Sequence, residues 1–406
     1  MNVDADCRRG SVPLTSHTEA VAAAEAFATA VRPGAADRDR AGAVPRAELA
    51  SFDRSGLPTI TVPVADGGAG LGPRTVAEVI RIIATADPAL AQIPQGHLLA
   101  VDILGLLGTS YQRERILPAV VEGGRIAPVL AERGGHHAQD LKTRLFADGP
   151  AYRLEGVKYY CTGAITSRWL AASALDSDGL LVLAFVERDA PGVAVDEDWA
   201  AMGQRATVSG TTTFDGVRVD PGLVVPYWSA FTGPQLLGAR AQLVHTAIEV
   251  GIAEGALAEA GEFVRTRSRP FFEAVRFGQV STASDDPHTL LRFGQLTTRT
   301  RAATQLLRWA ADVLDGLGLR PADTKAAARG SIAVAQAKAF GSDVAVDVAS
   351  QVFALTGASG TDQRFDLDRH WRNARTHSVH DPVDWKYHHI GAWELAGISP
   401  PSHGQI

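Results

Sequence analysis

Three long alanine-rich stretches in the second half of the chain constrain its fold more than any other feature. They cover residues 239–266, 289–317 and 321–355, and a fourth helical pattern passes through residues 369–374. Helices of this length bury their apolar faces against one another, and four of them pack as a bundle. Residues 229–406 are therefore predicted to form a C-terminal four-helix bundle.

The hydrophobic periodicity changes twice before this bundle. In residues 1–124 it is helical, with patterns at residues 16–31, 46–53, 75–86, 96–108 and 111–122. In residues 125–228 short strand-like runs alternate with turns, as at residues 151–156, 180–186 and 211–219, and this is typical of a small β-sandwich or β-barrel. The sequence thus predicts an α+β chain of three domains, namely a helical domain, a middle β domain and the bundle.

Composition and charge exclude several classes of protein. The net charge of −6 argues against a nucleic-acid partner. No apolar run approaches the roughly 18 to 20 residues of a membrane helix, so we expect no membrane segment and a cytoplasmic location. The two cysteines, Cys7 and Cys161, cannot form a disulfide framework, and neither suggests a metal site.

The segment at residues 369–383 carries the most informative polar residues. Pro382 disfavours helix immediately before it, so the helix through residues 369–374 should end near His380, with His377 and His380 on one face of its last turn. Two titratable rings at this position can serve as acid and base groups at the mouth of a pocket. They can equally be cationic side chains that satisfy terminal carbonyls. The spacing alone leaves both interpretations open.

A metal site built from these residues is the weaker hypothesis. His377, His380, His388 and His389 are close in the sequence, and paired histidines bind zinc. No cysteine or carboxylate spacing completes a ligand set, so we expect no metal.

Several motifs, taken in order, resemble the acyl-CoA dehydrogenase superfamily across nearly the whole chain. Residues 156–164 are similar to the strand that lies beside the flavin ring, and residues 202–207 with 214–219 are similar to the second signature of the middle domain. Residues 351–360 match the glycine-rich turn that contacts cofactor across a subunit interface. The order and spacing of these motifs imply the same fold of helical domain, β domain and bundle.

The C-terminal segment indicates the branch of that superfamily. The dehydrogenases have a catalytic glutamate before a glycine, whereas here Asp381 stands at that position and is followed by Pro382. This combination, with His377, resembles the flavin-dependent monooxygenases of the same fold, the branch that includes dibenzothiophene and alkylsulfone monooxygenases. The resemblance implies catalytic roles for His377 and His380, with Asp381 either orienting an imidazole or accepting N–H groups structurally.

The resemblance also implies the cofactor and partners. A monooxygenase of this branch uses reduced FMN and O2 to oxidise a small apolar substrate through a flavin C4a-(hydro)peroxide. The chain has no nicotinamide-binding fingerprint, so a separate flavin reductase should supply the reduced FMN. FAD remains possible. The alternatives are an FAD-containing acyl-CoA dehydrogenase with Asp381 as the base, and a catalytically silent scaffold of the same fold.

The remaining candidate residues follow from the same resemblance, and each also has a structural alternative. Flavin contacts are expected from the middle domain, from two arginines that would hold phosphate, and from the glycine-rich turn: Cys161, Thr162, Gly163, Trp199, Ser209, Arg267, Arg269, Gly357 and Gly360. His97 matches a substrate-pocket histidine, although a lone histidine on an apolar helix is more often a satisfied core residue. Because some of these cofactor contacts would come from another subunit, we expect a homotetramer built on the bundle.

Overall fold

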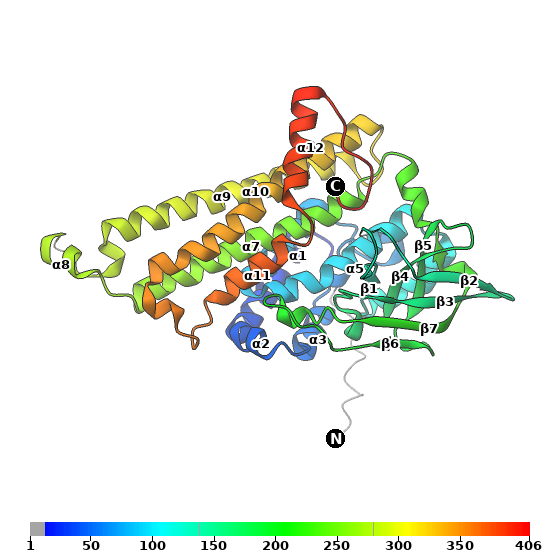
Figure 1. Cartoon of the computed structure of the whole chain (residues 1–406), viewed down its shortest axis with the longest axis horizontal. Coiled ribbons are helices and arrows are strands. Elements are labelled where there is room, and N and C mark those ends of the chain that lie inside the picture. The colour runs from blue at the N-terminus through cyan, green and yellow to red at the C-terminus, as the bar shows by residue number, and fades with distance from the viewer. Residues whose placement is uncertain (1–12, 138, 279) are drawn as a thin grey trace, which may run out of the picture.

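The chain folds into three units in the predicted order, as a computed structural model shows (Figure 1). The structure describes residues 13–406 apart from residues 138 and 279, so the prediction for Cys7 lies outside the described residues. The sheet lies at one end of the molecule, and the long helices of the bundle extend away from it (Figure 1). The predicted α+β fold class is confirmed.

The N-terminal unit consists of helices. Their bounds are α1 (His17–Val31), α2 (Ala35–Ala41), α3 (Arg46–Arg54), α4 (Pro73–Ala86), α5 (Pro88–Leu107) and α6 (Ser110–Val121). Asp87 separates α4 from α5 and accepts hydrogen bonds from the N–H groups of Ala89 and Leu90, which makes it the N-cap of α5. The prediction that this helix begins at residue 96 was wrong. Pro94 and Gly96 look like breakers, but burial of the helix on nearly all sides outweighs their low propensity.

Helix α5 is long and apolar. Among the described residues it is the one helix that is long and apolar enough to cross a membrane by those criteria alone, and 72% of its most apolar window is buried inside the fold. This burial is typical of a core helix.

The middle unit is one mixed sheet. Its strands are β1 (Ile126–Val129), β2 (Arg144–Asp148), β3 (Ala151–Lys158), β4 (Trp169–Leu175), β5 (Leu181–Glu187), β6 (Val193–Val195), β7 (Thr212–Val219) and β8 (Val224–Val225). The strand order is β6-β7-β3-β2-β4-β5-β8, with β1 parallel to β4. Strands β2 and β4 meet through one residue pair, Arg144 and Leu175, so the sheet consists of two halves joined at a narrow point.

Residues of β4 alternate between two cores. Leu170 and Ala172 face a core that they share with Leu154 of β3 and Val217 of β7, so the two halves of the sheet enclose apolar side chains between them. Trp169 faces the other way, toward apolar residues of α5 and α6. The period-2 pattern of the sequence thus separates the interior of the β unit from its contact with the N-terminal helices.

The C-terminal unit is the helical bundle. Its helices are α7 (Leu237–Thr266), α8 (Phe272–Gly278), α9 (Pro287–Leu317), α10 (Thr324–Thr356), α11 (Asp368–Ser378) and α12 (Val383–Ala396). The three long helices begin and end within a few residues of the predicted stretches. Helix α8 lies at the far tip of the bundle, and α12 projects from its side (Figure 1).

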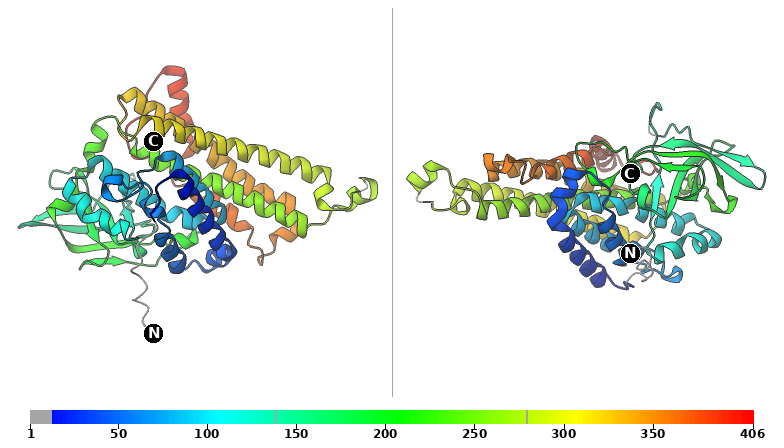
Figure 2. Two further views of the ribbon diagram at one scale, coloured as in Figure 1. Left: turned by 180° about the vertical axis from the view of Figure 1, so that it is seen from behind. Right: turned by 90° about the horizontal axis from the view of Figure 1, so that it is seen from below.

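The bundle and the N-terminal helices share one core, and the N-terminal helices lie against α7 in the views from behind and from below (Figure 2). Helices α4 and α7 cross closely because α7 has glycine at the crossing. A Cβ added at Gly251 would lie 2.5 Å from the Cβ of Ala84, and one at Gly255 would lie 2.6 Å from the carbonyl oxygen of Thr85. This close crossing sets the position of α7, which carries a residue of the candidate site.

Candidate functional site

Helix α11 is held in place by one arginine that contacts three carboxylates. The Arg372 guanidinium lies 2.7 Å from Asp39 of α2, 2.9 Å from Asp366 and 2.7 Å from Asp368. Burial and the nearby Asp39 raise the pKa of Asp366 to about 6. Because these contacts join α11 to the N-terminal unit, the end of the helix that carries the predicted histidines has a defined position.

Three histidines meet at the C-terminal end of α11. The Nε2 of His377 lies 3.1 Å from the Nδ1 of His245, a residue of α7. The ring of His245 also packs on the ring of His380, with centroids 4.2 Å apart. The centroids of His377 and His380 are 6.3 Å apart, so the two predicted histidines contact each other mainly through His245. Helix α11 ends at Ser378, so His377 lies in its last turn and His380 lies just beyond it, and the catalytic roles of both stay a prediction.

All three imidazoles are kept neutral by their surroundings. Burial, followed by the charges of neighbouring groups, holds the pKa values of His245 and His377 well below 6.5. His380 is the most solvent-accessible of the three, yet the protein around it still lowers its pKa through desolvation. A neutral imidazole has one N–H donor and one acceptor nitrogen, so each ring can give a proton and receive one.

Two buried ion pairs lie beside the histidines. Lys338 of α10 lies 2.5 Å from Glu249 of α7, and the hydroxyl of Ser342 donates to Glu249 over 2.7 Å. Asp381 lies 2.6 Å from the ammonium of Lys386 on α12. Each pair balances its own charge inside the protein, which buried charges require. The polar interior around the histidines is therefore strongly dipolar but carries little net charge.

Asp381 is paired with a lysine and makes no directional contact with an imidazole. Within the described part of the chain, neither of its carboxylate oxygens accepts a hydrogen bond from a histidine. The Asp381 charge nevertheless acts to raise the pKa of the neighbouring His380. Its orienting role in catalysis stays a prediction.

The two middle-domain motifs come together at a cluster of hydroxyl groups. The Oγ1 of Thr162 lies 2.6 Å from the Oγ of Ser209, which lies 2.8 Å from the Oγ1 of Thr207. Trp199 donates its ring N–H to the carbonyl of Gln204 over 3.0 Å. The residues predicted to line the flavin are thus neighbours, although Cys161 is buried and burial raises its thiol pKa to about 11.

The backbone around this hydroxyl cluster is strained. Tyr160, Gln204 and Val208 have φ values of 59°, 53° and 44°, in the left-handed region. This conformation is costly for a β-branched residue such as Val208. Strain of this kind persists where the surroundings hold the backbone in place, and it is common at ligand sites.

Helix α11 docks directly on this strained segment. The side-chain oxygen of Asn373 accepts a hydrogen bond of 2.5 Å from the backbone N–H of Gln204. A Cβ added at Gly203 would collide with the backbone of Arg372. The helix that carries His377 therefore packs on the segment that leads into the hydroxyl cluster, although the two come from different domains.

Four of the predicted cofactor residues lie elsewhere in the single chain. Arg267 and Arg269 are exposed beyond the far end of α7, and Gly357 follows the end of α10 with Gly360 close behind. Arg267 is 22 residues from His245, or about 33 Å along a straight helix. The guanidinium of Arg267 lies 4.9 Å from the centroid of the Phe365 ring. The roles of these four residues in cofactor binding stay a prediction.

His97 is buried, and both of its ring nitrogens contact the backbone. Its Nε2 lies 2.8 Å from the carbonyl of Pro58, and its Nδ1 accepts the N–H of Ile126 at 3.1 Å. Burial lowers its pKa to about 4. This geometry favours the structural alternative, and the substrate-binding role of His97 stays a prediction.

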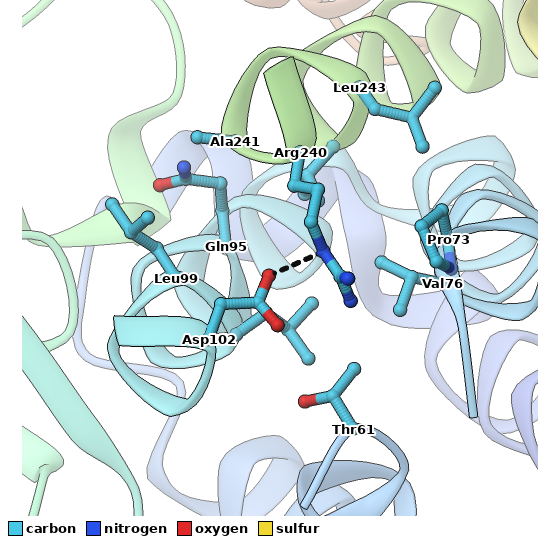
Figure 3. A pocket seen from close by; sticks show the side chains of 11 residues that line it. Thr61, Pro73, Val76, Gln95, Leu99, Asp102, Arg240, Ala241 and Leu243 are labelled. Atoms are coloured by element: carbon cyan, nitrogen blue, oxygen red, sulfur yellow. Dashed lines mark ion pairs between the residues drawn. The ribbon is translucent and has the colours of Figure 1, made fainter. Parts of the chain in front are cut away.

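A small cavity lies between α5 and α7. It has a volume of about 10 Å³, room for about one water molecule. The ion pair of Arg240 with Asp102, 2.8 Å long, crosses it, as Figure 3 shows. Its lining includes Val244, the residue before His245, but none of the three histidines. The cavity is too small to define a substrate, since ligand pockets are usually about 300 Å³ or larger.

Sequence reasoning missed four residues of the site: His245, Glu249, Lys338 and Lys386. One pattern could have indicated them. A polar residue within a long apolar, alanine-rich helix needs a partner, and His245 and Glu249 lie four positions apart on α7, as do Lys338 and Ser342 on α10. Within the described residues, no group of three or more histidine, cysteine or acidic side chains is arranged to hold a metal ion.

Comparison with known proteins identifies the class. The family model described as "Acyl-CoA dehydrogenase, N-terminal domain" matches residues 15–124. The model described as "Acyl-CoA dehydrogenase, C-terminal domain" matches residues 243–385. The chain belongs to the acyl-CoA dehydrogenase family.

Within this family, the proteins that the chain is similar to include monooxygenases. The chain is 34% identical to dibenzothiophene monooxygenase of Rhodococcus erythropolis over 94% of each protein. It is 31% identical to the probable FMNH2-dependent monooxygenase SfnC of Pseudomonas putida, over 90% of this chain and 92% of that protein. The crystal structure of FMN-bound TdsC from Paenibacillus sp. A11-2 matches with a TM-score of 0.90 at 31% identity. The match covers 95% of this chain and 100% of the TdsC chain. The resemblance to the monooxygenase branch is confirmed.

Proposed function

We propose that this protein is a flavin-dependent monooxygenase that uses reduced FMN and O2 to oxidise a small apolar substrate. The observation that carries the proposal is the docking of helix α11, which carries His377, on the segment beside the hydroxyl cluster through the contact of Asn373 with Gln204. The relatives named for FMN or FMNH2 support FMN over FAD.

The residues present fit a flavin. The side chain of Gln204 is buried, and neither its amide oxygen nor its amide nitrogen has a hydrogen-bond partner among the described residues. The hydroxyls of Thr162 and Ser209 can donate to or accept from the polar edge of a flavin ring, with Trp199 beside them. Arg267 and Arg269 of another subunit would hold the phosphate, because guanidinium groups pair well with phosphate oxygens.

When bound, reduced FMN supplies the electrons with which O2 gives one oxygen atom to the substrate and the other to water. The chain's own residues would control protons and solvent at that place. His380, the accessible ring, can hold or release a proton at a ring nitrogen, and His377 stands behind it with a hydrogen-bonded Nε2. The paired charges of Asp381 and Lys386 leave no excess charge beside the site.

The two alternative functions fit the site less well. As the base of an acyl-CoA dehydrogenase, Asp381 would need to approach a substrate, but it is buried and lies 2.6 Å from the Lys386 ammonium. A silent scaffold has no need of a cluster of three neutral histidines or of a strained segment nearby. A cytoplasmic location, where a separate reductase can deliver reduced FMN, is part of the proposal.

To test this function, the protein is assayed with a flavin reductase, NADH, FMN and O2. We expect oxygenated product from a small apolar substrate, with dibenzothiophene tried first because the relatives are named for it. We also expect reduced FMN to bind more tightly than oxidised FMN. Product analysis by mass spectrometry with ¹⁸O2 measures the transfer. Anaerobic bleaching of a bound yellow flavin by an acyl-CoA would support the dehydrogenase instead.

We further propose a homotetramer. Large apolar side chains are exposed at the tip of the bundle, where Phe271, Phe272 and Phe277 are 62%, 62% and 75% exposed. Exposed aromatic groups in this number are typical of an interface. The distance of Arg267 from the histidine site supports contact between subunits in the same region.

The assembly can be measured by light scattering. We expect a mass about four times the 42.8 kDa of one chain. Phe277→Asp should lower that mass, because a carboxylate would be desolvated in the interface. Val64→Asp is the matched control, since Val64 is 73% exposed on the N-terminal unit and should leave assembly intact. A monomer with full turnover would contradict the proposal.

A further inference from the structure

His245 is placed where it can control both predicted histidines. It lies on α7, is 2% exposed, and is separated by 132 positions from His377, its hydrogen-bond partner. Its ring lies between the other two, 5.0 Å from the centroid of His377 and 4.2 Å from that of His380. No other histidine has ring contacts with both His377 and His380 among the described residues.

The short distance between His245 and His377 determines how their protons are arranged. Two neutral imidazoles have one N–H each, so a contact of 3.1 Å between Nδ1 and Nε2 requires one nitrogen to donate and the other to accept. If the Nδ1 of His245 carries its proton, the Nε2 of His377 is the acceptor and its Nδ1 carries the proton. If His245 accepts, the proton of His377 is on Nε2. The tautomer of His377 is therefore coupled to that of His245.

Charged and titratable groups surround this pair on α7, α10, α12 and the segment that follows α11. Glu249 comes from α7, Lys338 from α10, Asp381 and His380 from the end of α11, and Lys386 from α12. Both carboxylates are paired with lysines, so neither is free to balance an imidazolium. Burial, then the nearby histidines and lysines, holds the pKa of His245 well below 6.5. The pair stays neutral, and hydrogen bonding rather than charge links its two rings.

We infer that His245 is a positioning residue that selects the tautomer of His377 and supports the ring of His380. The inference rests on the proposed function, because it assigns His245 to the same site. It also gives a role to the hydrogen bond of a buried polar side chain, which would be costly to leave without a partner.

Two substitutions separate the hydrogen bond from the ring. His245→Phe keeps an aromatic ring under His380 and removes the partner of His377. His245→Asn places an amide near the position of Nδ1 and removes the ring. We expect His245→Phe to lower the product formed per O2 consumed by about tenfold or more, and His245→Asn to remain within about threefold of the original protein, with reduced-FMN affinity unchanged in both. The exposed His288→Asn on α9 is the control.

Two further measurements do not depend on turnover. Nitrogen NMR of histidine-labelled protein without flavin should show one tautomer for His377 in the original protein and in His245→Asn, and a mixture in His245→Phe. The second is stability against pH. The unfolded chain takes up a proton on His245 below about pH 6.5 that the folded chain does not. The free energy of unfolding therefore decreases as pH falls below 6.5. In both variants the slope of this free energy against pH should be smaller, by the equivalent of about one bound proton.

The outcomes distinguish this inference from the proposed function. Absence of oxygenated product with the original protein would overturn the function, while the NMR and pH measurements would still test His245. Full coupling in His245→Phe, or an equal loss in a folded His245→Asn, would overturn the positioning role. If His245→Phe does not fold, the tautomer and coupling of His245→Asn decide, and a changed tautomer there counts against the inference.

Discussion

Replacing His380 or His377 with Asn should lower oxygenated product by about 10²- to 10⁴-fold, the usual contribution of general acid or base catalysis. The ring of His380 is the accessible one of the cluster. The hydrogen bond of His377 to His245 couples the tautomer of His377 to that of His245. Oxygen consumption should continue and release hydrogen peroxide, because in the proposed function the flavin is held by the hydroxyl cluster and not by these histidines. Product and hydrogen peroxide are measured side by side.

The same experiment tests the structural alternative for these histidines. If they only satisfy terminal carbonyls of α11, each Asn variant should cost about 1 kcal/mol or less and leave turnover nearly intact. His288→Asn again serves as the control. Asp381→Asn belongs in the series: a dehydrogenase would lose all activity, whereas a monooxygenase should show weaker coupling and normal flavin binding. Full coupling in both histidine variants would remove them from the catalytic residues.

Lys338→Met should lower the free energy of unfolding by about 3–5 kcal/mol. Lys338 and Glu249 both have 0% of their side chains exposed, and burial already raises the pKa of Glu249. Without the lysine, Glu249 keeps the hydroxyl of Ser342 but loses its charge partner. The folded state must then hold an unpaired carboxylate or protonate it, and either change costs stability. Urea denaturation at pH 7 measures the loss.

A second substitution shows whether the unpaired charge is the cause. Lys338→Met combined with Glu249→Gln removes both charges and keeps a hydrogen-bond partner for Ser342, so most of the lost stability should return. Arg265→Met is the comparison on the surface, where the Arg265–Glu262 pair is 60% and 63% exposed and should contribute at most about 1 kcal/mol. If Lys338→Met alone lowers the free energy of unfolding by less than about 1 kcal/mol, Glu249 is already protonated or solvated by water in the folded state.

Local periodicity predicted most of the architecture because it records which face of each element is buried. The alanine-rich stretches became α7, α9 and α10 with ends within a few residues of those expected. The early part of α5 was missed for the opposite reason. Pro94 and Gly96 disfavour a helix locally, and only packing of that segment on nearly all sides makes the helix stable.

Short motifs predicted one part of the site and left another part hidden. Thr162, Trp199 and Ser209 follow from segments whose order resembles the family, and they are neighbours in the fold. His245 and Lys338 belong to no such motif. In the sequence nothing distinguishes them from the other polar residues of α7 and α10, and a buried histidine is ordinarily a satisfied core residue.

The sequence by itself determined the order of the three units, the long helices of the bundle and the family, and it indicated His377 and His380 as candidates, because each depends on residues close together in the chain. Tertiary structure alone decided which groups those histidines meet. The crossing of α7 with α10 and α11 places His245 against His377, and Lys338 against Glu249. The contact of Asn373 with Gln204 docks helix α11 on the segment beside the hydroxyl cluster. A periodic pattern specifies that a face is buried but not which partner covers it, and the protonation states of buried groups depend on that partner.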